Sequence, residues 1–346
     1  MTSQESCAGI IRHIKEHVPS DKAQVMEYLV AIEDHYAVHP CQKEVSGIIA
    51  SLATWSFSAD EFQTFMSRVK NPDTITECVL SSVISFLDKR DARSALQEIL
   101  FILPYAEDPY QEPGKFLAFR DFIEYAYYIS SFAPDQDLKI HPYLNSDILF
   151  QYGRICALKE EKEMARTIFV FLSRISPVNA AILLELAEIL REERNLDEYR
   201  HLTNLCLQYA WIPEELARAY RNMGYYLTET GDYAGAATCY LMSTTWEDSA
   251  VTASELMFIR GKSGKSLDIS FILSHGREIL DERNIPFGPN PEIIDLMVDY
   301  SDELKQDGDL FEARKYLSRA KAIELSDRLE RKIEVIERFI EDYTVF

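Results

Sequence analysis

The chain has 346 residues, of which 47% are hydrophobic and 27% are charged, so it can bury a sizeable core. It contains 12 glycines and 13 prolines, too few for the many turns of a sheet-rich fold, and this favours helices. Its formal net charge of −21 repels the phosphates of nucleic acids and anionic lipids. We therefore expect it to bind neither nucleic acid nor membranes, and to favour basic or neutral partners.

The N-terminus and the cysteines predict a location. The first twenty residues lack a basic segment followed by an apolar one, so no secretory signal is predicted. No apolar run approaches the roughly 18 residues that a membrane-spanning helix needs. The six cysteines are far apart and form no CxxC pair. We therefore expect a cytoplasmic protein with six reduced, mostly buried thiols.

Residues 1–145 are predicted to form a helical region of diverged repeats or an N-terminal cap. They show no sustained alternation of apolar and polar residues, and therefore no confident strand. Residues 91–105 resemble the second helix of a helix pair, with Ala95 at a position that requires a small side chain. Two breaks are expected, at residues 104–115 and at residues 131–143, because both are rich in loop-forming residues.

Two histidine pairs in this region could suggest a metal. His13, Glu16 and His17 spell H-x-x-E-H, a spacing that can place two imidazoles on one helix face. A zinc protease would also need a further ligand and a mixed α/β domain, which this helical chain lacks. His35 and His39 have helical spacing too, but Pro40 follows at once. We expect surface histidines and no metal site.

Internal repeats are clearest in residues 217–248. Gly224 and Ala236 are small where two antiparallel helices would cross, and Tyr220 and Tyr240 fill the space around that contact. Gly231 can end the first helix in a left-handed conformation without steric cost. In these positions the segment resembles a tetratricopeptide repeat.

The same frame recurs at a period of about 34 residues, over residues 146–326. Residues 251–290 have the length of one unit but fit poorly, with Phe258 at a small position. The positions that match elsewhere are Gly153, Ala165, Phe169, Pro177, Ala187, Gly308, Leu310, Ala313, Leu317 and Ala320.

The resemblance implies an all-α fold, an α-solenoid of antiparallel helix pairs that form a right-handed superhelix. Each pair cannot bury its own apolar faces, so stability comes from stacking. We expect three parts: a helical N-terminal region at residues 1–145, repeats at residues 146–326, and a C-terminal capping helix at residues 327–346.

In this family the first helices of the pairs line a concave groove that binds partners. Some members grip a peptide carboxylate there, but Glu185 and Glu188 would repel one, so that clamp is not expected here. Lys262 would face the groove in the poorly fitting unit. The other residues predicted to face it are Phe150, Arg154, Glu188, Arg191, Arg218, Arg221, Tyr225 and Thr228.

Catalytic motifs are not found. The GKSGKS segment at residues 261–266 resembles a phosphate-binding loop, but Ile259 stands where that motif needs glycine, and the preceding segment is predicted to be helical. No Ser/His/Asp set, Cys/His pair or carboxylate dyad can be assembled from the spacing. We therefore expect no catalytic residues and no cofactor.

The function expected from the resemblance is that of a non-enzymatic scaffold, which binds a peptide or a helix of a protein partner. One alternative is a peptide-sensing regulator, although such regulators usually carry a DNA-reading domain and no basic recognition helix is present. A less favoured alternative is a metal-dependent hydrolase that uses His13 and His17. The sequence leaves self-association into a homo-oligomer open.

Overall fold

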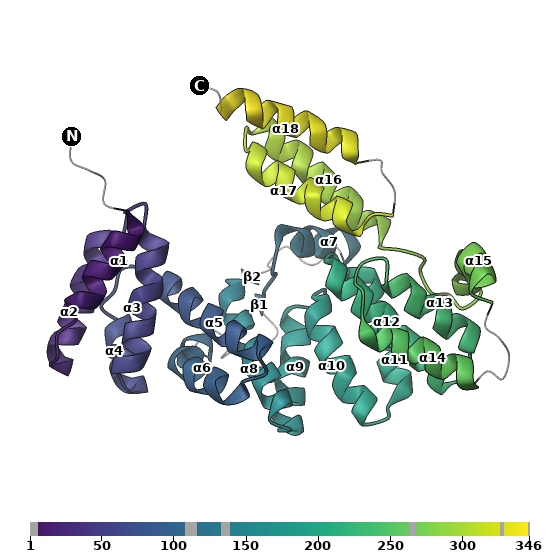
Figure 1. Cartoon of the computed structure of the whole chain (residues 1–346), viewed down its shortest axis with the longest axis horizontal. Helices are drawn as coiled ribbons and strands as arrows, with labels where there is room; N and C mark the ends of the chain where they lie inside the picture. The colour runs from purple at the N-terminus through teal and green to yellow at the C-terminus, as the bar shows by residue number, and fades with distance from the viewer. Residues whose placement is uncertain (1–5, 108–115, 133–138, 263–267, 326–328, 345–346) are drawn as a thin grey trace. The chain divides into compact units, whose positions relative to one another are not determined.

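The computed structural model describes residues 6–107, 116–132, 139–262, 268–325 and 329–344. In these ranges the chain forms 18 helices and one two-stranded sheet (Figure 1). The prediction of an all-α solenoid of helix pairs is confirmed. The chain divides into two compact units, unit 1 (Met1–Phe116 and His141–Ile168) and unit 2 (Leu117–Ile140 and Phe169–Phe346). The predicted boundary at residue 145 does not coincide with this division.

Unit 1 is a stack of helices around one continuous apolar core. Helix α3 packs on α2 and α5, α5 pairs with α6, and α6 packs on α8. Buried residues from Ile10 to Ile155 belong to the same core cluster. Its helices are α1 (Cys7–Glu16), α2 (Lys22–Tyr36), α3 (Gln42–Ser56), α4 (Ala59–Met66), α5 (Pro72–Asp88), α6 (Ala92–Glu107), α8 (Tyr143–Leu158) and the first half of α9 (Lys162–Ile175).

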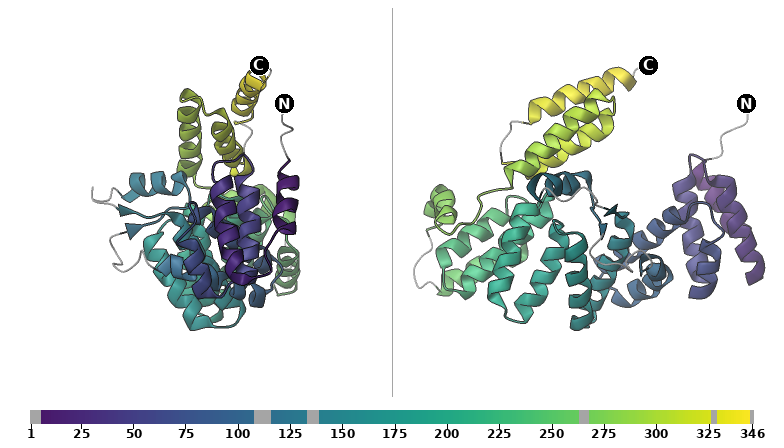
Figure 2. Two further views of the ribbon diagram at one scale, coloured as in Figure 1. Left: turned by 90° about the vertical axis from the view of Figure 1, so that its left-hand side faces the viewer. Right: turned by 180° about the vertical axis from the view of Figure 1, so that it is seen from behind.

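Unit 2 contains three close hairpins, α10–α11, α12–α13 and α16–α17, whose short connections make the helices antiparallel (Figure 2). No described helix is both long and apolar enough to cross a lipid bilayer. The strands β1 (Phe116–Leu117) and β2 (Lys139–Ile140) pair with each other. The helices are α7 (Phe122–Phe132), α10 (Ala180–Glu192), α11 (Leu196–Tyr209), α12 (Pro213–Glu229), α13 (Tyr233–Ser243), α14 (Ala250–Lys262), α15 (Ile269–Asp281), α16 (Pro291–Gln306), α17 (Leu310–Ile323) and α18 (Glu330–Thr344).

One turn recurs between paired helices in both units. A residue with positive φ ends the first helix, and the next residue precedes the second helix. In one copy the Asp232 amide donates to the Leu227 carbonyl (2.8 Å) and the Asp232 carboxylate accepts from the Gly235 amide (3.1 Å), so groups at both helix ends are satisfied. The five copies are Arg90-Asp91, Glu160-Glu161, Arg194-Asn195, Gly231-Asp232 and Gly308-Asp309.

The position four residues after each of these turns is fully buried. The spacing from Glu160 to Arg194 is 194 − 160 = 34 residues, which is the period expected from the sequence. The same turn and the same buried position therefore also occur in the α5–α6 pair. In that region only Ala95 was matched to the repeat pattern from the sequence. The buried residues are Ala95, Ala165, Tyr199, Ala236 and Ala313.

Gly224 allows the closest approach within the α12–α13 hairpin. A Cβ atom added to Gly224 would lie 3.0 Å from the Tyr240 ring, closer than an ordinary van der Waals contact. The sequence placed Ala236 opposite Gly224, but the nearest side chain is that of Tyr240. The small residue is therefore needed to accommodate an aromatic ring.

The prediction of six thiols is wrong for one pair of cysteines. Cys7 and Cys41 form a disulfide, with an S–S distance of 2.02 Å and a Cα–Cα distance of 5.5 Å. Cys7 begins α1 and Cys41 immediately precedes α3, and α1 packs on α3. The pairing depends on that packing, so sequence spacing could not reveal it. The remaining cysteines, Cys78, Cys156, Cys206 and Cys239, are free.

Within unit 2, α7 and the residues just before it belong to a cluster of charged and aromatic side chains. The Trp211 ring lies between two guanidinium groups, with Arg120 at 4.8 Å and Arg319 at 5.2 Å from its centroid. Its indole donates to buried Glu124 (3.2 Å), whose pKa is raised by burial although Arg120 opposes the shift. Asp121 accepts a hydrogen bond from Arg319 (3.0 Å). These contacts connect α7 and the residues just before it to Trp211, which precedes α12, and to Arg319 on α17.

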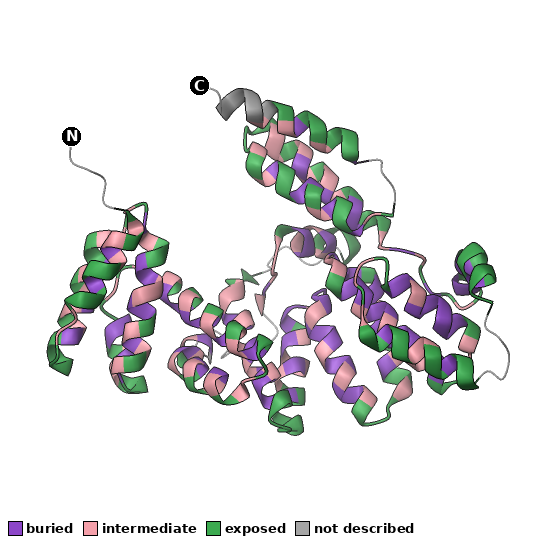
Figure 3. Ribbon diagram, viewed as in Figure 1, coloured by how far each residue is buried: buried purple, intermediate pink, exposed green. Residues whose placement is uncertain are grey.

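The poorly fitting unit also departs from the hairpin pattern. Helices α14 and α15 each pack chiefly on α13. They show long exposed stretches in Figure 3, whereas α12 and α13 are largely buried. Phe258, at the position where a repeat needs a small residue, is 50% exposed. A large side chain is tolerated there because it does not enter the core.

Candidate functional site

Six of the eight predicted groove residues lie on two helices of unit 2. Glu188 and Arg191 belong to α10, and Arg218, Arg221, Tyr225 and Thr228 belong to α12. We call these six the α10–α12 face.

The structure brings three members of the α10–α12 face into direct contact. Arg191 forms an ion pair with Glu188 on the same helix. Its guanidinium carbon lies 5.4 Å from the centroid of the Tyr225 ring, within the range of a cation–π interaction. Arg191 therefore links α10 to α12.

The other members of the α10–α12 face are also engaged within the chain. Arg218 pairs with Glu185 (Nη1–Oε1 2.6 Å), and Arg221 pairs with Glu247 (Nη2–Oε2 2.7 Å). Arg221 is only 17% exposed. Thr228 is buried and donates to the Gly224 carbonyl (2.8 Å). A charged ligand on this face would have to compete with existing ion pairs.

The two remaining predicted groove residues lie in unit 1. Phe150 and Arg154 are on α8, where Arg154 donates to the Gln151 side chain (2.9 Å). They therefore belong to a different compact unit from the α10–α12 face. Lys262 ends α14, and its ammonium lies 5.5 Å from the Phe258 ring centroid.

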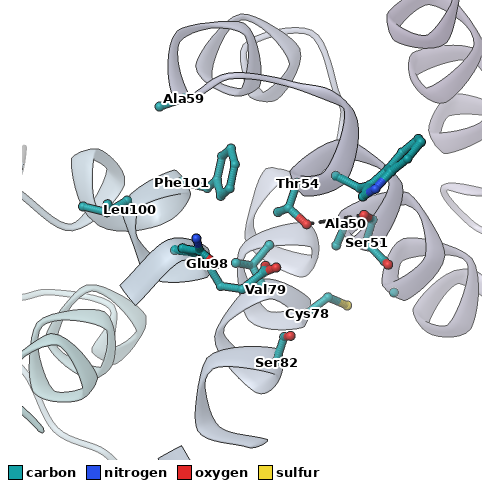
Figure 4. Close-up of a pocket in the computed structure, with 13 residues that line it drawn as sticks. Ala50, Ser51, Thr54, Ala59, Cys78, Val79, Ser82, Glu98, Leu100 and Phe101 are labelled. Atoms are coloured by element: carbon teal, nitrogen blue, oxygen red, sulfur yellow. Dashed lines mark hydrogen bonds between the residues drawn. The ribbon is translucent and has the colours of Figure 1, made fainter. Parts of the chain in front are cut away.

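A hollow of about 750 Å³ lies elsewhere, within unit 1. We call it the N-terminal groove. Figure 4 shows Glu98 and Phe101 of α6 on one side and Thr54 of α3 on the other. Its volume falls within the range of about 300–1,000 Å³ that is typical of ligand pockets. It is lined by Gly47, Ala50, Ser51, Thr54, Trp55, Ala59, Cys78, Val79, Ser82, Gln97, Glu98, Leu100 and Phe101.

The short helix α4 contributes Ala59 to the lining of this groove. Ser58 and Glu61 form a capping box, with Ser58 N donating to Glu61 Oε2 (2.7 Å), so a new helix begins after a connection of two residues. Helix α4 has 8 residues and α6 has 16, about 12 Å against about 24 Å. It packs on α6 through Phe62 and Phe101 (ring centroids 5.2 Å apart).

The groove combines exposed apolar side chains with small residues. Trp55 is 84% exposed and Leu100 is 47% exposed, and both line the same hollow, so their apolar surfaces are accessible to a ligand there. No atom outside the local helix lies within 4 Å of a Cβ built on Gly47. The lining therefore combines apolar and polar side chains and has unfilled space beside α3.

Glu98 supplies the charge in this lining. It is half-buried, and burial raises its pKa, an effect that a hydrogen bond with Thr54 partly offsets. In the part of the chain that the structure describes, no lysine or arginine pairs with Glu98. At Cys78, burial raises the thiol pKa, with Glu77 adding to the shift and Lys43 opposing it.

The N-terminal groove was missed by the sequence interpretation because residues 1–145 were judged by their fit to the repeat frame. A local signal was present. Gly47, Ala50, Ser51 and Thr54 recur at helical spacing on α3, which makes one face of small residues. Trp55 stands next to that face, yet exposure of a tryptophan cannot be read from sequence.

The structure also shows where most of the residues considered for metal or phosphate binding lie. The ring centroids of His13 and His17 are 4.0 Å apart, and His17 lies just after α1. Within the described ranges, no group of three His, Cys, Asp or Glu residues could hold a metal ion. Helix α14 extends to Lys262, so the segment before GKSGKS is helical as predicted. Residues 263–266 of that motif lie outside the described residues.

No family model matches the chain, and no curated protein shows significant similarity to it.

Proposed function

We propose that this protein is a non-enzymatic interaction scaffold of the tetratricopeptide type, which binds a short peptide segment of a protein partner. The observation that carries the proposal is the N-terminal groove, an open hollow between helix pairs with an exposed tryptophan at its edge. Aromatic anchors beside apolar pockets provide much of the binding energy at peptide-binding surfaces. The groove lies in unit 1. The helices that line it, α3, α5 and α6, are fixed relative to one another because their buried residues belong to the same apolar core.

The proposal assigns no catalytic role and no cofactor to the chain. It places the protein in the cytoplasm, where the Cys7–Cys41 disulfide would exchange with cellular thiols. The net charge of −21 disfavours nucleic acid and anionic membranes as partners. The α10–α12 face remains a second candidate surface, although a ligand there would have to displace internal ion pairs.

Selection from a random peptide library tests this function. Peptides of twelve residues displayed on phage would be selected on the full chain, with parallel selections on Trp55→Ala. We expect a set of peptides that the wild type enriches and Trp55→Ala does not. Removing one aromatic anchor commonly costs about 2 kcal/mol or more, which is roughly thirty-fold in affinity.

The matched control is Phe311→Ala on α17, which removes another exposed aromatic side chain (66% exposed) outside the groove. It should leave the selected set unchanged. Both substitutions remove exposed side chains, so both variants should fold, as circular dichroism can verify. If no enriched peptide depends on Trp55, the groove is not the binding surface and the proposed function fails.

A further inference from the structure

The lining of the N-terminal groove carries a single formal charge. Of its thirteen lining residues, all of which the structure describes, Glu98 alone carries a formal charge. The remaining polar side-chain groups are the hydroxyls of Ser51, Thr54 and Ser82, the Gln97 amide, the Cys78 thiol and the Trp55 indole N–H. None of these can neutralise a carboxylate. Among its lining residues the groove therefore presents one formal charge, which is negative, while Glu77 and Lys43 lie near Cys78 outside the lining.

Partial burial of Glu98 makes its charged form less favourable than it would be in water. Its side chain is half-buried against α3, with the Thr54 hydroxyl as its hydrogen-bond partner. A partly buried carboxylate is stabilised far more by a cation than by a hydroxyl. In the α10–α12 face, by contrast, Glu185 and Glu188 each have an arginine partner. The cation that would complete the Glu98 site is missing from the described part of the chain.

The side chains beside Glu98 suit the rest of a cationic residue. Lysine and arginine carry long apolar stems below their charged ends. Leu100 and Phe101 offer apolar contacts for such a stem or for a neighbouring apolar side chain. The exposed face of Trp55 can additionally stack on a guanidinium or ammonium group.

We infer that the N-terminal groove binds a basic amphipathic peptide segment, in which a lysine or arginine pairs with Glu98 and a neighbouring bulky apolar side chain lies against Phe101 and Leu100. This inference rests on the proposed function and specifies the chemistry of the partner. The charge complementarity at Glu98 selects this occupant over an acidic or neutral peptide. The overall charge of the protein adds a longer-range attraction for the same class of ligand.

The test uses the peptides whose enrichment depends on Trp55. We expect these peptides to share a lysine or arginine next to a bulky apolar residue. One such peptide, labelled with fluorescein, would be titrated by fluorescence anisotropy against the full-length wild type, Glu98→Gln and Glu16→Gln. Both substitutions remove one negative charge from unit 1, but Glu16 is exposed on α1 and outside the groove lining.

The expected result is a loss of about tenfold in affinity for Glu98→Gln and almost none for Glu16→Gln. A peptide with its basic residue changed to Glu should bind the wild type weakly and recover on Glu98→Lys. Glutamine retains the size of Glu98 and can still accept from Thr54, so the variant should fold.

The outcomes separate the two proposals. Trp55-dependent peptides that are neutral or acidic, or equal losses for Glu98→Gln and Glu16→Gln, would overturn the assignment of a basic ligand while leaving the groove as the binding surface. The absence of any Trp55-dependent peptide would overturn both.

Discussion

The N-terminal groove and the α10–α12 face use similar residue types in different ways. Both combine aromatic rings with charged side chains on adjacent helices. On the α10–α12 face, Arg191 contacts Glu188 and Tyr225, and Arg218 contacts Glu185. In the groove, Trp55 is largely exposed and Glu98 lacks a cation among the described residues.

The difference shows why residue type does not by itself identify a binding surface. An arginine that is already paired across two helices contributes mainly to the stacking of those helices. An aromatic ring or a carboxylate without such a partner can interact with a ligand at lower cost, because no internal contact has to be broken. Predictions that separate stability from binding therefore distinguish the two regions.

The largest expected effect concerns the disulfide of unit 1. The Cys7–Cys41 bond closes a loop with a sequence separation of 34 residues, which in the chain-entropy model stabilises the folded state by roughly 4 kcal/mol. Reduction, or Cys7→Ser, should increase hydrogen exchange in α1–α3 and leave the hairpins of unit 2 unchanged. Mass spectrometry of peptic fragments, with and without dithiothreitol, measures this.

Cys78→Ser provides the control for this prediction, because Cys78 is a free cysteine of the same unit. That variant should respond to reductant like the wild type. If reduction leaves the exchange of α1–α3 unchanged, the disulfide does not support unit 1.

A smaller effect is expected from two glycine substitutions. Gly224→Leu must push a side chain into the Tyr240 ring, which already lies 3.0 Å from a Cβ position, so it should lower the free energy of unfolding by about 1–3 kcal/mol or more. Gly47→Ala adds a Cβ into open space inside α3 and should raise it by roughly 0.5–1 kcal/mol. Urea denaturation measures the free energy of unfolding of both variants. Equal changes in the two variants would contradict the expected difference between a closely packed hairpin and an open groove.

An effect between those of the two glycine substitutions is expected at Arg218. Arg218→Ala leaves Glu185, whose side chain is 19% exposed, without its cation, and should lower stability by about 1–2 kcal/mol. A double-mutant cycle with Glu185→Gln isolates the pair. Binding of the groove peptide should not change. A large loss of peptide affinity with unchanged stability would instead place the binding surface on the α10–α12 face.

Much of the helix arrangement could be predicted from sequence because its causes are local. Gly231 and Gly308 have positive φ at the predicted turns, and Ala165, Ala236 and Ala313 are buried where the repeat frame needs small residues. Helical periodicity and turn chemistry act within a few residues. The same reasoning did not resolve α4 or α7, which are short helices without a matching repeat position.

The candidate site was much less predictable. The frame predicted that Arg191 and Tyr225 would both face the groove, and the structure shows in addition that the two side chains are in contact. It could not show that Arg218 and Arg221 would be neutralised by Glu185 and Glu247. Such pairs join residues that are distant in sequence, and their formation depends on how the helices pack.

The sequence by itself determined that this protein is built from helix pairs, because composition, periodicity and small residues at fixed positions all favour that fold. The tertiary structure alone decided which surfaces are open. Trp55, Glu98 and Phe101 line one groove only because α3 and α6 both pack on α5. Cys7 and Cys41 meet only because α1 packs on α3. Contacts between distant segments are fixed by packing, which no local pattern encodes.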